Sequence, residues 1–119
     1  MNAPSTGLRI SDLDGVSRVD FVDRNILDEA NIQQIGDALG QLVDSSPRPR
    51  VLICFENVEH LSSAALGTLI TVSYGVKARD GQLRLSDIRP QLLEVFRITR
   101  LDQMFNIHDH AGDAMGSFG

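Results

Sequence analysis

Residues 51–67 read VLICFENVEHLSSAALG, and this stretch decides the fold because an apolar run and a helical pattern meet within it. The continuous apolar residues Val51–Phe55 predict a strand covered on both faces. From Ser63 onward apolar residues recur at helical spacing, which predicts a helix ending near Arg79. Two hydroxyls, those of Ser62 and Ser63, lie at the start of this helix. A serine at such a place caps a helix or carries a phosphate.

The segments on either side complete an alternation of strands and helices. Upstream, extended segments around the turn dipeptide Asp14-Gly15 predict a hairpin. The other expected elements are a helix over 29–44, a strand over 82–86, a helix from Pro90 and a last strand around 104–107. Such an order predicts an α/β fold with right-handed crossovers. Its central sheet is mostly parallel, with about four to five strands and helices packed on it.

Length and composition predict one domain. The chain has 119 residues, of which 42% are hydrophobic, enough for a core without metals or disulfides. The small polar residues 1–7 predict a flexible tail, residues 8–111 the domain, and the glycine-containing residues 112–119 a loose tail. The single cysteine, Cys54, lies inside the apolar run, which indicates a buried thiol rather than a disulfide.

Charge and the N-terminal sequence narrow the partners. The net charge of -5 disfavours nucleic acid and anionic membranes as partners. No signal peptide and no apolar run of membrane-spanning length is found in the sequence. We therefore expect a cytoplasmic protein.

The residue patterns of enzymes and cofactor sites are missing. There is no Gly-x-Ser-x-Gly nucleophile motif, no Gly-rich phosphate loop, and no spacing that ties His60 to Ser63 as a base. His108-Asp109-His110 has two imidazoles but no third ligand cluster nearby, so we expect a solvated turn and no metal site. The sequence predicts neither a catalytic residue nor a cofactor.

The order of elements and the serine motif together resemble the anti-sigma factor antagonist family, the STAS domains. Members of that family usually carry Asp-Ser-Ser-Gly-Leu-Gly at the start of the second helix, and Ser62-Ser63-Ala64-Ala65-Leu66-Gly67 occupies those places here. Asp80-Gly81 and the segment 95–101, Val-Phe-Arg-Ile-Thr-Arg-Leu, also match the family pattern. The resemblance covers about residues 8 to 111 and differs at the aspartate, the second serine and the first glycine.

The resemblance implies a switch rather than an enzyme. In such antagonists an anti-sigma factor that is also a serine kinase phosphorylates the first serine, the phosphorylated form no longer binds it, and a phosphatase resets the protein. Carried over by position, the phosphorylated residue is Ser63, with Ser62 as second choice. The partner-binding residues that it implies are Asp23, Ser62, Ser63, Ala64, Ala65 and Gly67.

Two alternatives stay open because Ser62 replaces the family aspartate. One is an interaction scaffold that uses the same surface without phosphorylation. The other is a regulatory module that binds a small ligand. Arg97 and Arg100, one helical turn apart, can also grip a partner's carboxylate or phosphate, although exposed arginines beside an apolar helix face are usually solvated.

Overall fold

The computed structural model describes residues 8–22, 24–26 and 29–118. Its strands are β1 (Leu8–Leu13), β2 (Val16–Phe21), β3 (Asn25–Ile26), β4 (Arg50–Cys54), β5 (His60–Leu61), β6 (Gln82–Ser86) and β7 (Asn106–His108). Its helices are α1 (Glu29–Asp44), α2 (Ser63–Ala78), α3 (Pro90–Ile98), a 3-10 turn η1 (Leu101–Gln103) and α4 (Ala111–Gly116). The elements predicted from periodicity are therefore confirmed.

Five strands form one sheet in the order β1-β2-β4-β6-β7. β1 pairs antiparallel with β2, and every other pair in this sheet is parallel, which confirms the mostly parallel α/β architecture. Asp14 and Gly15 join β1 to β2 with φ angles of 52° and 82°. Two consecutive left-handed residues form the type I′ turn that suits a two-residue hairpin.

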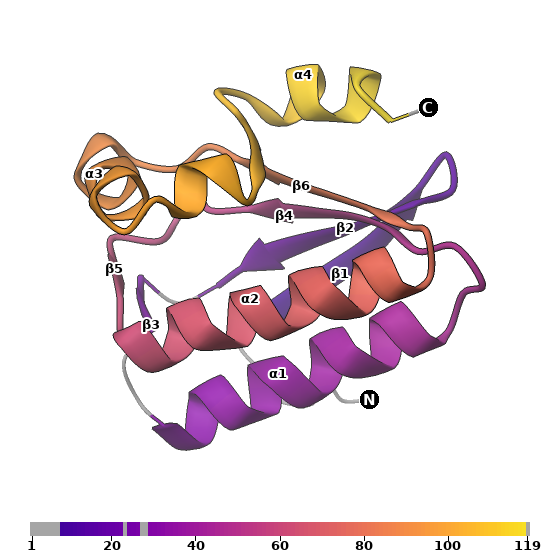
Figure 1. The fold of residues 1–119 in the computed structure, drawn as a ribbon, viewed down its shortest axis with the longest axis horizontal. Helices are drawn as coiled ribbons and strands as arrows, with labels where there is room; N and C mark the ends of the chain where they lie inside the picture. The colour runs from indigo at the N-terminus through magenta and orange to yellow at the C-terminus, as the bar shows by residue number, and fades with distance from the viewer. Residues whose placement is uncertain (1–7, 23, 27–28, 119) are drawn as a thin grey trace.

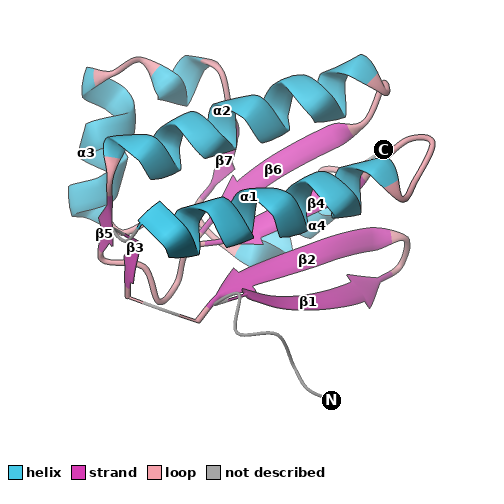
Figure 2. Cartoon of the chain, turned by 90° about the horizontal axis from the view of Figure 1, so that it is seen from below, coloured by secondary structure: helices cyan, strands magenta, loops and turns pink. Residues whose placement is uncertain are grey.

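Helices cover both faces of the sheet. In Figure 1, α1 and α2 lie side by side on one face, α4 lies on the other, and α3 packs at one end. Figure 2, turned by 90° so that the molecule is seen from below, shows the two long helices running across the sheet. β4 is buried on both faces as predicted, since Val51 and Ile53 join the core under α1 and α2 while Leu52 and Cys54 join the core under α4.

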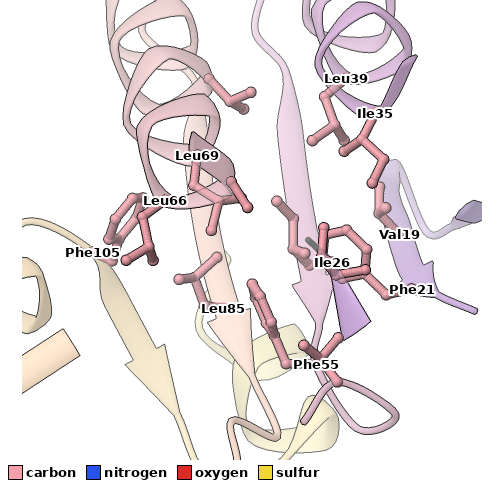
Figure 3. Close-up of a cluster of buried hydrophobic side chains, with 14 of the residues drawn as sticks. Val19, Phe21, Ile26, Ile35, Leu39, Phe55, Leu66, Leu69, Leu85 and Phe105 are labelled. Atoms are coloured by element: carbon pink, nitrogen blue, oxygen red, sulfur yellow. The ribbon is translucent and has the colours of Figure 1, made fainter. Parts of the chain in front are cut away.

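The larger core holds most of the buried side chains and extends to the end of the sheet where α2 begins (Figure 3). Four aromatic rings connect it in a row, with centroid distances of 5.2 Å from Phe21 to Phe55, 6.3 Å from Phe55 to Phe96 and 6.0 Å from Phe96 to Phe105. Tilted and edge-on ring pairs of this kind add to the stabilisation from burial. The core thereby fixes α2 and α3 against the same end of the sheet.

The C-terminal residues differ from the loose tail predicted over 112–119. α4 docks on the sheet through Ala114, which is 0% exposed, against the second core of Val16, Leu52 and Cys54. The Arg84 side chain also holds this end, because its Nε donates to Ser117 Oγ at 2.9 Å and its guanidinium lies 5.0 Å from the Phe118 ring centroid. Packing overrides the low helix propensity of a segment with glycines at 112 and 116.

The segment 56–60, between β4 and α2, is more than a connecting loop. Its middle residue Val58 is 0% exposed, and its last residue begins β5, which pairs in parallel with β3.

Among the described residues, the helices are too short or too polar to cross a membrane.

Candidate partner-binding site at the start of α2

Two short strands hold the chain where it enters α2. Asn25 is in register with His60 and Ile26 with Leu61. The N–H of Ser62 then donates to the carbonyl oxygen of Ile26 at 3.0 Å. Because backbone bonds fix this approach, the position of the serine motif depends little on its own side chains.

Ser62 is the N-cap of α2. Its φ and ψ angles of -79° and 165° are extended, and its Oγ accepts a hydrogen bond from the N–H of Ala65 at 3.1 Å. Its carbonyl oxygen accepts from the N–H of Leu66 at 3.1 Å. The hydroxyl thus supplies the capping that a carboxylate gives in the family motif, without the negative charge.

Ser63 is the first residue of α2 and is exposed, as are Ala64 and, one turn further along the helix, Gly67. No described residue accepts a hydrogen bond from the Ser63 hydroxyl or from the N–H groups of Ser63 and Ala64. The first turn of a helix carries such amide donors and the positive end of the dipole. A phosphate on Ser63 would lie where a helix tolerates negative charge best.

The predicted residue Ala65 does not belong to the surface. It is 5% exposed and packs in the larger core, because its position in the second half of the first turn faces the sheet. The extra methyl group, compared with the family's glycine, therefore adds core packing and leaves the surface unchanged. The remaining exposed residues of the motif are Ser63, Ala64 and Gly67.

The other predicted partner residues are less simply placed. Asp23 lies outside the described residues. Arg97 donates to Glu94 Oε1 at 2.8 Å on the exposed face of α3, and Arg100 follows α3 with a φ of 62°. The structure thus places Arg97 and Arg100 in different local geometries instead of on one helical face.

Sequence reasoning missed the contribution of Arg24 and Ile26. The carbonyl oxygen of Arg24 accepts from the N–H of Glu59 at 2.7 Å and from that of His60 at 3.2 Å, and the Arg24 side chain lies 3.7 Å from Glu59. Two-residue strands have no periodicity, so the sequence carried no signal for this support.

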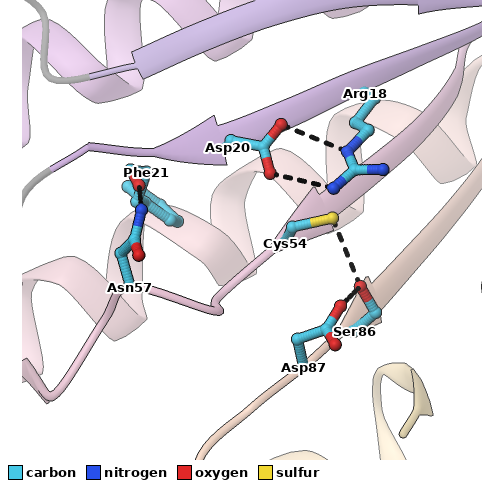
Figure 4. Close-up of polar contacts among 7 residues, drawn as sticks. All are labelled: Arg18, Asp20, Phe21, Cys54, Asn57, Ser86 and Asp87. Carbon is cyan, nitrogen blue, oxygen red and sulfur yellow. Dashed lines mark hydrogen bonds and ion pairs between the residues drawn. The ribbon is translucent and has the colours of Figure 1, made fainter. Parts of the chain in front are cut away.

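A second polar cluster lies on the α4 face of the sheet (Figure 4). Arg18 makes a two-bond ion pair with Asp20, at 3.1 Å and 3.3 Å. The Ser86 hydroxyl lies 3.3 Å from Cys54 Sγ and donates to Asp87 Oδ2 at 2.8 Å. Most of the hydrogen-bonding groups in this cluster are therefore paired with one another.

The 108–110 segment leaves the sheet at His108, and Asp109 and His110 are exposed, in agreement with the predicted solvated turn. β7 ends at His108, whose Nε2 is buried without a partner among the described residues, and His110 is the N-cap of α4, 3.8 Å from Asp87. Among those residues, no three His, Cys, Asp or Glu side chains are placed to hold a metal ion.

The family model of the STAS domain matches residues 21–114, which is most of the chain and includes the serine motif. The chain belongs to the STAS family. A relative from Bordetella bronchiseptica, BtrV, provisionally named an anti-sigma factor antagonist, is 26% identical over 80% of this chain and 81% of its own.

Solved STAS structures share the fold. An anti-sigma factor antagonist domain protein from Planctomyces limnophilus superposes with a TM-score of 0.84 at 22% identity, over 94% of this chain and 97% of that one. The anti-sigma factor antagonist SpoIIAA, solved in its unphosphorylated form, superposes with a TM-score of 0.70 at 14% identity, over 91% and 93%. At these identities the likeness shows the common STAS fold.

Proposed function

We propose that this STAS domain is an anti-sigma factor antagonist that binds an anti-sigma factor with serine kinase activity and is switched by phosphorylation of Ser63. The observation that carries the proposal is the division of roles at the start of α2. Ser62 Oγ is engaged as the helix cap, whereas the Ser63 hydroxyl is exposed on the adjacent position. The similarity to BtrV, which is provisionally named an anti-sigma factor antagonist, supports an anti-sigma factor as the partner.

The switch follows from charge. Phosphorylation adds about -1.5 to -2 charges at neutral pH to the surface formed by Ser63, Ala64 and Gly67. The helix start stabilises that charge within the free protein. Against a partner that packs on this surface, however, the dianion imposes desolvation and repulsion, so the kinase releases its product. A phosphatase then restores the binding form.

Phosphate mapping tests the site. The protein, Ser63→Ala and Ser62→Asp are incubated with the cognate kinase and ATP, and the phosphate is located by mass spectrometry. Ser62→Asp removes one hydroxyl but keeps a capping side chain, so it is the matched control. We expect uptake by the unmodified protein and by Ser62→Asp, and none by Ser63→Ala. Equal uptake by Ser63→Ala would reject Ser63 as the acceptor.

The alternative is a scaffold that binds through the same surface without phosphorylation. The neutral Ser62 in place of the family aspartate is the observation that favours it, because a carboxylate beside the hydroxyl would help to orient it. Under this alternative, Ser63→Ala retains full function in the cell and the kinase transfers no phosphate. The proposed site does not include a catalytic group or a cofactor.

A further inference from the structure

The outer edge of β1 is the long open edge of the sheet. β1 is the end member of the strand order and pairs with β2 only. All of its residues except Leu8 are exposed, and Ile10 and Leu13 are 46% and 40% exposed although both are large and apolar. β7, at the opposite edge, has three residues only. An exposed edge of six residues is a template for pairing with another strand.

The hairpin geometry decides which backbone groups of β1 point outward. In a two-residue hairpin the flanking residues, here Leu13 and Val16, form a pair that exchanges both hydrogen bonds. Bonded and non-bonded pairs alternate from there, so Ile10 and Asp12 direct their N–H and C=O groups away from β2. No strand among the described residues pairs with these groups.

We propose that β1 pairs antiparallel with β1 of a second copy of this chain, about a two-fold axis at Ile10. A two-fold axis perpendicular to the sheet keeps the same face on the same side in both copies. Outward-directed residues must then meet outward-directed residues. Near the middle of the strand this places Ile10 opposite Ile10, Ile10 opposite Asp12, or Asp12 opposite Asp12.

Side-chain chemistry selects the first arrangement. In the first arrangement two isoleucines that are each 46% exposed bury one another and each Leu8 lies opposite Asp12, whereas the second pairs both isoleucines with carboxylates and buries no isoleucine pair, and the third opposes like charges. Ile10 is in register with Val19, which is 0% exposed in the larger core, so the isoleucine pair extends that core across the axis. On the other face, Arg9 lies opposite Ser11.

The dimer is closed and weak. The two-fold axis uses the β1 edge of both copies, so the contact does not continue into a fibre. One strand pair is smaller than the usual stable interface, so the dimer forms in a concentration-dependent way. β1 and the start of α2 lie apart with α1 between them in Figure 2, so pairing leaves both Ser63 surfaces open.

Disulfide crosslinking tests the register in the full chain. Ile10→Cys and Ser11→Cys are oxidised with copper phenanthroline, with the unmodified protein as background because Cys54 is buried. A directly opposed hydrogen-bonded pair has Cα atoms about 5.5 Å apart, within disulfide range. The two Ser11 Cα atoms would be separated by more than about 7 Å, because two residue rises separate them along the strands.

We expect rapid dimer crosslinking of Ile10→Cys and only background crosslinking of Ser11→Cys. Faster crosslinking of Ser11→Cys would overturn the register, and background crosslinking of both variants would overturn the pairing. Sedimentation provides a second measurement without new thiols. Ile10→Lys should abolish the rise in mass with concentration, whereas Ile98→Lys, at a residue 72% exposed on α3, should retain it. A rise retained by Ile10→Lys, or absent from the unmodified protein, would also overturn the proposal.

Discussion

At the scale of single residues, the two adjacent serines have different tasks. Ser62 is half-buried and its oxygen accepts from the N–H of Ala65, while Ser63 is exposed and starts the helix. The replacement of the family aspartate by Ser62 therefore preserves the cap and removes a negative charge next to the proposed phosphate. Substitutions at Ser62 should consequently change the stability of the protein, whereas substitutions at Ser63 should change its phosphorylation.

Ser62→Ala should lower the free energy of unfolding by about 1 kcal/mol, because the N–H of Ala65 loses its capping acceptor. Ser63→Ala should change it by less than about 0.5 kcal/mol, since an exposed side chain without a partner is removed. Urea denaturation of both variants measures the difference. If Ser63→Ala were as destabilised as Ser62→Ala, the assignment of Ser62 as the N-cap would be wrong.

Cys54 is the buried titratable side chain of the second core. Burial raises the pKa of its thiol, and the Ser86 hydroxyl and the Arg18 charge oppose that shift only in part. The unfolded chain therefore loses this proton at a lower pH than the folded protein. Above the unfolded pKa the unfolded state binds fewer protons, so the folded state loses stability as pH rises.

The free energy of unfolding should accordingly fall above about pH 8.5, the ordinary range of a cysteine. Cys54→Ala is the comparison that isolates the contribution of the thiol. We expect this variant to show a shallower decline than the unmodified protein in denaturation series across alkaline pH. Parallel declines would mean that Cys54 does not contribute.

At the scale of elements, the turn between α2 and β6 sets the register of the sheet. The N–H of Gly81 donates to Val76 at 2.9 Å, and the N–H of Gln82 donates to Pro49 at 2.8 Å, where β4 is about to begin. A side chain at Gly81 would collide with the Pro49 carbonyl oxygen and ring. The close approach of two backbone segments thus explains this glycine.

Gly81→Ala should destabilise the protein by about 1–3 kcal/mol, the usual range for forcing extra atoms into a packed contact. Gly40→Ala is the matched control, because it adds the same methyl group inside α1 where nothing lies within 4 Å. It should stabilise by up to about 1 kcal/mol through helix propensity. Thermal unfolding of both variants measures the contrast, and similar melting temperatures would contradict it.

The elements also show what the sequence can predict. The 29–44 helix and the 51–67 stretch were predictable because long periodic or continuous apolar patterns dominate local structure. β3 and β5 were not, since two-residue strands depend on contacts between distant segments. The docking of Ala114 was hidden by glycines, because packing rather than propensity forms α4. At the candidate site, the place of Ser63 in the family motif was enough to single it out. The burial of Ala65 in the core could be learned only from the structure.

At the scale of the whole molecule, the fold separates three surfaces. The start of α2 presents Ser63 at one end, α4 seals the second face of the sheet, and β1 leaves an edge open. A phosphate at the α2 start changes charge without disturbing either core. We therefore propose that phosphorylation of Ser63 controls partner binding through local charge rather than through unfolding.

Calorimetric titration of the cognate anti-sigma factor kinase tests this claim most directly, with unmodified protein compared with protein phosphorylated at Ser63. Matching far-UV circular dichroism spectra of the two forms would first establish that both are folded. We predict that the phosphorylated form binds at least about tenfold more weakly, a loss of about 1.4 kcal/mol or more. Equal dissociation constants for the two folded forms would show that the phosphate on Ser63 does not control partner binding.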